Sequence, residues 1–184
     1  MRKVIVSEFV TLDGVMESPD KWHFPYWSDE MGKYKFDELL ASDALLLGRV
    51  TYEGFAAAWP SATDEEGFAD RMNGLPKFVA STTLEEPLEW NNSTLIKGNV
   101  AEEVSKLKQQ PGQDILIGGS ADLVNALLQH DLIDEFRLMV HPVIVGSGKR
   151  LFGDGSDTKG LSLVDTKTLG SGVVVLTYQP ARSE

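Results

Sequence analysis

The chain of 184 residues contains no cysteine and only three histidines. The lack of cysteine excludes disulfides and thiolate metal sites, and it favours a reducing, cytoplasmic location. His23, His130 and His141 do not have the spacing of metal ligands, so no metal site is expected. The segment "MRKVIVSEFV" alternates apolar and polar residues, which predicts a first strand rather than a signal peptide.

Long apolar runs and positive charge are also scarce. No stretch approaches the length needed to cross a bilayer, so no membrane-spanning segment is expected. The 28 acidic residues outnumber the 17 lysines and arginines, which gives a formal net charge of −11. This charge argues against nucleic acid or an anionic membrane as a partner and leaves a small molecule as the expected ligand. An anionic ligand would need local backbone N–H groups at helix starts and a few placed cations.

What the sequence does contain is a regular alternation of strand and helix patterns. Its length and its hydrophobic share of 42% fit one soluble globular domain over residues 1–184. Hydrophobic periodicity predicts strands at residues 3–10, 44–48, 77–81, 93–97, 114–119 and 134–145, helices at 28–42, 51–59, 100–110 and 120–131, an acidic loop at 60–75, and a hairpin over 161–180. This order predicts a three-layer α/β/α fold whose central sheet is mostly parallel and carries a C-terminal antiparallel hairpin at its edge.

Ligands of such sheets bind beyond the carboxyl ends of the strands, and "GRVTYE" follows one of these ends. Gly48 allows a close approach of backbone, and Arg49 offers a planar fork suited to phosphate. Thr51 can cap the helix that follows. A plain strand-to-helix turn is an equally good interpretation of this segment.

Two further strand ends carry hydroxyls or glycines. Ser81 and Thr82 follow the strand 77–81, where they indicate either a turn or contact with a ribose or its phosphate. Gly118 and Gly119 precede Ser120, which is expected to cap the next helix. Free N–H groups would then meet the positive end of the helix dipole, which favours an anion site.

The end of the first strand brings a carboxylate and an aromatic ring. Asp13 lies in an Asp-Gly pair that is typical of a turn, and Glu17 and Trp22 follow it. Beside a crevice, these side chains would suit a heterocyclic substrate. The segment "GSGKRLF" at 146–152 lacks the spacing of a Walker phosphate loop and is expected to form a tight turn.

Taken in order, five segments resemble the dihydrofolate reductase superfamily: "VTLDGVM", "LLLGRVTYE", "VAST", "ILIGGSADL" and "DEFRLMVHPVIVGSGKRLF". They look most like the reductase domain of the bifunctional riboflavin-biosynthesis deaminase–reductase and its small stand-alone relatives. The resemblance extends from Val4 to about Tyr178. It implies a dihydrofolate-reductase-like fold that binds NADPH across the strand ends, and a homodimer.

The resemblance also implies roles for the residues at the strand ends. The cofactor phosphates would lie at Gly48, Arg49 and Thr51, the adenosine 2′-phosphate near Ser81 and Thr82, and the pyrophosphate at Gly118, Gly119 and Ser120. Asp13 and Trp22 would line the substrate side. The acid that true dihydrofolate reductases carry early in their first helix has no clear match in Asp29 or Glu30.

The predicted function is therefore an NADPH-dependent reductase of a small heterocyclic or carbonyl/imine compound, resembling 5-amino-6-(5-phosphoribosylamino)uracil reductase. Asp13 would orient or protonate the substrate and Trp22 would stack on it, with Glu17 beside them. Two alternatives stay open at this point. One is a non-catalytic module that binds a nucleotide-like ligand, and the other is a genuine dihydrofolate reductase.

Overall fold

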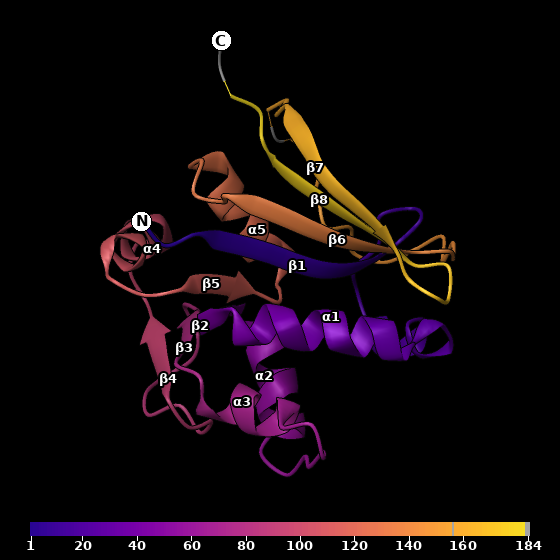
Figure 1. Cartoon of the computed structure of the whole chain (residues 1–184). Coiled ribbons are helices and arrows are strands. Elements are labelled where there is room, and N and C mark those ends of the chain that lie inside the picture. Colours follow the sequence, from indigo (N-terminus) through magenta and orange to yellow (C-terminus); the bar gives the residue numbers. More distant parts are fainter. Residues whose placement is uncertain (156, 183–184) are drawn as a thin grey trace.

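The computed structural model describes residues 1–155 and 157–182. Its central element is an eight-stranded sheet (Figure 1). The strands are β1 (Val4–Thr11), β2 (Ser42–Gly48), β3 (Lys77–Ala80), β4 (Ser93–Ile96), β5 (Asp114–Ile117), β6 (Glu135–His141), β7 (Leu161–Thr168) and β8 (Val174–Pro180). Their order is β4-β3-β2-β5-β1-β6-β8-β7, with β4 through β6 parallel and the β7–β8 hairpin antiparallel. The predicted sheet, including its antiparallel edge, is confirmed.

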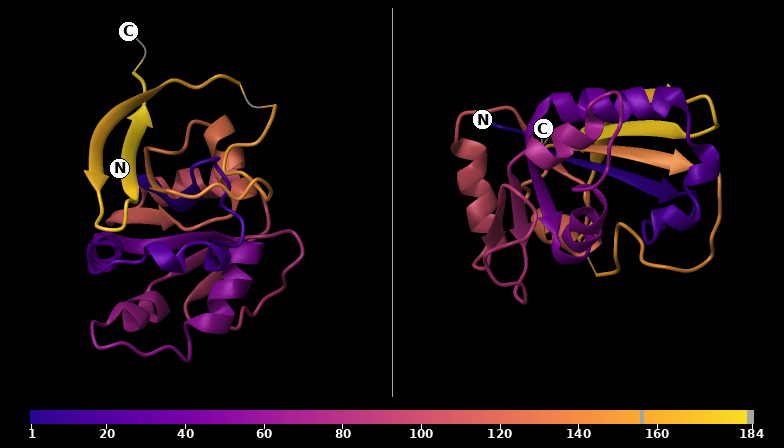
Figure 2. Two further views of the ribbon diagram at one scale, coloured as in Figure 1. Left: turned by 90° about the vertical axis from the view of Figure 1, so that its right-hand side faces the viewer. Right: turned by 90° about the horizontal axis from the view of Figure 1, so that it is seen from below.

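Helices cover both faces of the sheet (Figures 1 and 2). They are α1 (Asp29–Leu40), α2 (Arg49–Ala58), α3 (Phe68–Gly74), α4 (Val100–Gln109) and α5 (Ala121–Gln129), joined by the short 3₁₀ helices η1 (Pro19–Lys21) and η2 (Phe24–Tyr26). Leu39, Tyr52 and Met72 of α1, α2 and α3 share one buried cluster. Leu107 of α4 and Leu127 of α5 belong to a different one. The two clusters lie on opposite faces, so the three-layer prediction is confirmed.

The sequence prediction was wrong for residues 60–75, which are not all loop. Helix α3 occupies the second half of this segment. The carboxylate of Asp64 accepts hydrogen bonds from the backbone N–H groups of Gly67, Phe68 and Ala69 at 2.7, 2.9 and 2.7 Å. One carboxylate thus satisfies the free donors that a helix start exposes, and the acidic run is partly a cap.

The predicted strand 134–145 is also shorter than expected, because β6 ends at His141. Pro142 follows, and proline cannot donate a hydrogen bond to a neighbouring strand. The chain then turns, with Gly146 at a φ of 79°. None of the helices in the described part of the chain is long and apolar enough to cross a membrane.

Candidate active site

A cavity of about 1580 Å³ opens where the parallel strands end, and we call it the strand-end cavity. Its walls include Phe9 of β1, Leu47 of β2 and Ala80 of β3, together with Gly118, which follows β5. These residues are far apart in the chain but meet because parallel strands end at the same edge of the sheet. The predicted location of the ligand crevice therefore coincides with a real cavity.

Two glycine-bearing junctions, β2–α2 and β5–α5, touch each other at this cavity. The N–H of Gly48 donates to the carbonyl of Gly119 at 2.9 Å. A Cβ atom at Gly48 would collide with the side chain of Ser120, and one at Gly119, whose φ is 128°, would lie 2.5 Å from Thr51 Oγ1. Glycine is therefore required at both positions, since a side chain from the opposite junction occupies the space that an added Cβ would need.

The junctions direct two helix starts at the cavity. Ser120 caps α5 by accepting a hydrogen bond from the N–H of Leu123, as predicted. The prediction that Thr51 caps the other helix was wrong, because α2 begins at Arg49 with Gly48 as its N-cap. Gly48, Thr51 and Ser120 all line the cavity, whereas Gly119 supports it from behind. Two positive helix ends at one cavity favour an anionic ligand.

Arg49 lines the cavity in a partly exposed ion pair. Its guanidinium lies 3.0 Å from the carboxylate of Glu53, one turn along the same helix, and 44% of its side chain is exposed. An exposed pair of this kind contributes little to stability. The guanidinium is therefore free to turn toward an anion in the cavity.

At the ends of β3 and β4 the cavity gains hydroxyls and a lysine. Ser81 and Thr82 line it, and Ser81 Oγ also accepts hydrogen bonds from the N–H groups of Thr83 and Leu84 at 3.1 and 3.0 Å. The register pairs Ala80 with Ile96, so the next residues on the two strands, Ser81 and Lys97, lie side by side. The sequence reasoning missed Lys97, because its neighbour on the other strand depends on the register.

Asp13, the predicted catalytic residue, does not line the cavity among the residues that the structure describes. Its carboxylate accepts hydrogen bonds from the Thr11 hydroxyl at 2.5 Å and from the N–H groups of Gly146 and Val145 at 2.9 and 3.4 Å. The bond from Thr11, followed by that from Gly146, holds the pKa of Asp13 below its usual value. This geometry favours a structural role, in which Asp13 ties the turn after β6 to the end of β1.

The two predicted substrate residues have different surroundings. Glu17 lines the cavity, and its carboxylate accepts a hydrogen bond from the N–H of Lys149 at 3.3 Å. Trp22 is only 7% exposed and lies outside the cavity lining of the described chain. Its Nε1 donates to the Glu17 carbonyl at 3.1 Å, and its ring meets His141 edge-on. Trp22 thus supports the wall instead of presenting a ring to a ligand.

Other aromatic side chains form the cavity wall near α1, and the sequence reasoning missed them. They are Phe9, His23, Phe24 and Trp27. Phe9 stacks on His23 with 4.2 Å between ring centroids. Phe24 and Trp27 are 66% and 50% exposed, which is unusual for residues of this size. Exposed rings beside a cavity are suited to a flat, heterocyclic ligand.

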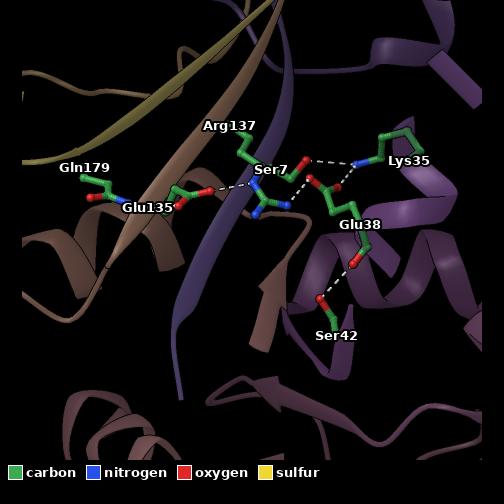
Figure 3. Close-up of polar contacts among 7 residues, drawn as sticks. All are labelled: Ser7, Lys35, Glu38, Ser42, Glu135, Arg137 and Gln179. Atoms are coloured by element: carbon green, nitrogen blue, oxygen red, sulfur yellow. Dashed lines mark hydrogen bonds and ion pairs between the residues drawn. The ribbon is translucent and has the colours of Figure 1, made fainter. Parts of the chain in front are cut away.

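A charged network under the sheet fixes Lys35 at the same wall (Figure 3). The Lys35 ammonium lies 3.0 Å from Ser7 Oγ and 2.8 Å from Glu38, and Arg137 reaches the other oxygen of Glu38 at 3.2 Å. Burial alone would raise the pKa of Glu38, but Lys35, Ser7 and Arg137 together hold it below its usual value. Lys35 is therefore held in place beside a carboxyl group whose charged form its neighbours favour.

The fold and the cavity define a protein of the dihydrofolate-reductase-like class. The model of the RibD C-terminal domain family matches residues 2–175, and the chain belongs to that family. It is 35% identical over 181 residues to the uncharacterised protein YyaP of Bacillus subtilis (strain 168), covering 96% of this chain and 94% of YyaP. It is 30% identical over 175 residues to YwjB of the same organism, covering 94% and 95% of the two chains.

Solved structures share the fold. A candidate riboflavin biosynthesis protein of Shewanella sp. PV-4 superposes with a TM-score of 0.79 at 22% identity, over 98% of this chain and 99% of the other. The Thermotoga maritima diaminohydroxyphosphoribosylaminopyrimidine deaminase/5-amino-6-(5-phosphoribosylamino)uracil reductase gives a TM-score of 0.66 at 16% identity. That match covers 98% of this chain and 57% of the Thermotoga protein, so the present chain corresponds to about half of it.

Proposed function

We propose that the protein is an NADPH-dependent reductase that transfers hydride to a small heterocyclic or carbonyl/imine compound, resembling 5-amino-6-(5-phosphoribosylamino)uracil reductase. The observation that carries the proposal is the meeting of two glycine-bearing junctions and two helix starts at one cavity. Together they offer backbone N–H groups and positive dipole ends to a pyrophosphate, in a chain whose net charge of −11 would otherwise repel it.

The residues present fit the chemistry of this cofactor. Gly48, Gly118 and Ser120 would hold the pyrophosphate, with Arg49 turning toward it. Ser81, Thr82 and Lys97 would hold the 2′-phosphate that distinguishes NADPH from NADH, because two hydroxyls and an ammonium are good partners for a phosphate. When bound, NADPH supplies the hydride.

The chain would hold the second reactant against the aromatic wall. Phe24 and Trp27 offer ring faces, and His23 adds a polar edge. The wall is dominated by apolar atoms, so water would be displaced from between the two reactants. A pyrimidine, as in the reaction named for the Thermotoga protein, has the flat polar shape that such a wall accepts.

Isothermal titration of the purified protein with NADPH and with NADH tests the cofactor. Turnover is then followed as loss of NADPH absorbance with 5-amino-6-(5-phosphoribosylamino)uracil and, separately, with dihydrofolate. Tight binding of NADPH and oxidation with the pyrimidine support the proposal. Failure to bind either dinucleotide ends it, whereas binding without turnover of any acceptor would support the non-catalytic module instead.

We also propose that the protein forms a homodimer through β7. Every residue of this edge strand is exposed, and Leu163 and Val164 are 55% and 53% exposed. Exposed edges with apolar side chains are normally covered. Light scattering should give twice the chain mass, and Leu163→Lys should give the monomer mass. A monomeric wild-type protein would contradict this proposal.

A further inference from the structure

Glu8 is a carboxyl group inside the sheet at the wall of the strand-end cavity. Its side chain lines the cavity, yet the residue is only 5% exposed. Its Oε1 atom is buried and has no hydrogen-bond partner within residues 1–155 and 157–182. A buried polar atom without a partner destabilises a fold, so its presence at a cavity wall calls for a functional explanation.

The lengths of the strands place Glu8 at the opening. On one side of β1, Glu8 is paired in register with Leu138 of β6. On the other side, β5 ends at Ile117, which is paired with Val6, two residues before Glu8. The next residue after β5, Gly118, lines the cavity and has no side chain. The early end of β5 therefore leaves Glu8 beside the cavity instead of beside another strand.

Glu8 occupies a position on β1 whose neighbours on the same face are apolar core residues. Side chains alternate along a strand, and Val6 and Val10, on either side of Glu8 on the same face, both belong to the buried cluster under α4 and α5. Stability alone would favour a third apolar side chain at this position. A buried acid in such a row costs stability, which is typical of a functional residue.

The pKa of this carboxyl responds to burial and to two charged groups. Lys35 and Glu38, both from α1, are the charged groups that influence it, and they oppose each other. Burial, the largest effect, raises the pKa of Glu8 to about 8, with Glu38 raising it and Lys35 lowering it. At neutral pH the side chain therefore carries a proton, and its pKa is near the value at which a general acid is most effective.

We propose that Glu8 is the catalytic acid that protonates the substrate during reduction; this inference rests on the proposed function. The carbon of the C=O or C=N group gains the hydride, and NADPH becomes NADP⁺. The Glu8 O–H bond breaks, and its proton goes to the substrate oxygen or nitrogen as the double bond becomes single. The carboxylate that remains regains a proton from the solvent.

Glu8→Gln tests this assignment, since glutamine keeps the shape of the protonated side chain and removes the transferable proton. With NADPH and 5-amino-6-(5-phosphoribosylamino)uracil, kcat should fall by about 100-fold to 10,000-fold, while the Kd for NADPH changes less than about twofold. Wild-type kcat should decrease as the pH rises through about 8, and the residual activity of Glu8→Gln should lack this decrease. Glu8→Asp, which keeps the acid but shortens it, should retain the pH dependence with a lower kcat.

Asp114→Asn is the matched control. Asp114 begins β5 at the opposite end of the strand from the cavity, and burial raises its pKa as well. This variant should leave kcat and its pH dependence unchanged. Melting temperatures of all three variants show whether a loss of activity is a loss of folding.

The outcomes separate the two proposals. A wild-type protein that does not bind NADPH overturns the proposed function and the role of Glu8 with it. Turnover that Glu8→Gln leaves intact overturns only the role of Glu8. Infrared difference spectra of the wild-type protein need no acceptor: a protonated-carboxyl band at pH 7 that disappears at high pH, and is missing in Glu8→Gln, is expected. Absence of that band also overturns the assignment.

Discussion

His23 Nδ1 lies 3.0 Å from His141 Nε2, so one of these two buried rings donates a hydrogen bond to the other. His141 Nδ1 lies 2.9 Å from the Met139 carbonyl, which can only accept, so His141 Nδ1 must carry its proton. His141 Nε2 is then the acceptor for the proton on His23 Nδ1. His23 Nε2 is left as an acceptor on a residue that lines the cavity, suited to an N–H or O–H donor of a ligand.

This pair predicts a specific pH dependence of stability. Burial, with a smaller effect of His141, lowers the pKa of His23 from 6.5 to about 4. Between these values the unfolded chain binds more protons at this site than the folded chain does, so the free energy of unfolding should decrease as the pH falls. Chemical denaturation at pH 7 and pH 5 measures the decrease. His23→Phe should show a smaller decrease, and an equal one would contradict the low pKa.

Gly48→Ala should weaken the site through crowding. The added methyl group meets the side chain and backbone nitrogen of Ser120, and overpacking of this kind costs about 1–3 kcal/mol. The β2–α2 and β5–α5 junctions would move apart, and the Kd for NADPH should rise by about tenfold or more. Gly74→Ala is the control, because nothing lies within 4 Å of the added atom there. Titration calorimetry of both variants gives the comparison, and equal affinities would argue against a close junction.

Lys97→Gln should reduce the preference for NADPH over NADH. Removing a charged partner of the 2′-phosphate costs about 1.5–3 kcal/mol, which is about tenfold to 100-fold in the Kd for NADPH. The Kd for NADH should stay the same, since that dinucleotide lacks the phosphate. Lys106→Gln is the control, because Lys106 pairs with Glu102 and Glu103 on α4. A parallel loss of affinity for both dinucleotides would contradict the assignment.

Lys35→Met should destabilise the fold, because it removes one of the two cations that hold the buried Glu38 carboxylate. We expect a loss of about 2 kcal/mol in the free energy of unfolding. Lys33→Met, on the same helix, removes a pair with Asp37 in which both side chains are more than half exposed, and it should change stability by less than about 0.5 kcal/mol. Urea denaturation of both variants measures the difference, and equal losses would contradict this account.

The arrangement of the sheet could be predicted because strand and helix patterns alternate clearly, and because parallel strands bring their ends together. That rule placed Gly48, Ser81 and Gly118 at one cavity. Helix α3 was missed because its start depends on Asp64, which reads as one more acid in a polar run. The hydrogen bonds from Gly67, Phe68 and Ala69 to Asp64 are local, but the acidic composition of the run does not reveal them.

The acidic residue at the wall of the strand-end cavity was harder to predict. The polar pair Ser7 and Glu8 in "VIVSEFV" looks like an ordinary interruption of a strand. Their different surroundings depend on β5 ending at Ile117, which only the register reveals. Asp13 was chosen from a turn motif, and its hydrogen bonds to residues more than 130 positions away were not visible locally. Contacts between distant segments, not composition, separated Asp13, which is held by hydrogen bonds, from Glu8, whose Oε1 has no partner among the described residues.

Strand β7, the edge of the proposed homodimer, is not a regular strand along its whole length. The pairing of β7 with β8 shifts between Leu163 and Asp165, which marks a bulge in the outermost strand. A bulge bends a strand and interrupts its row of free backbone groups. A charged side chain on the same strand, such as Lys167, disfavours pairing with another strand that places a like charge opposite it. In the proposed homodimer, the bulge would restrict the alignments at which a second copy pairs with β7, and it disfavours continuous extension of the sheet.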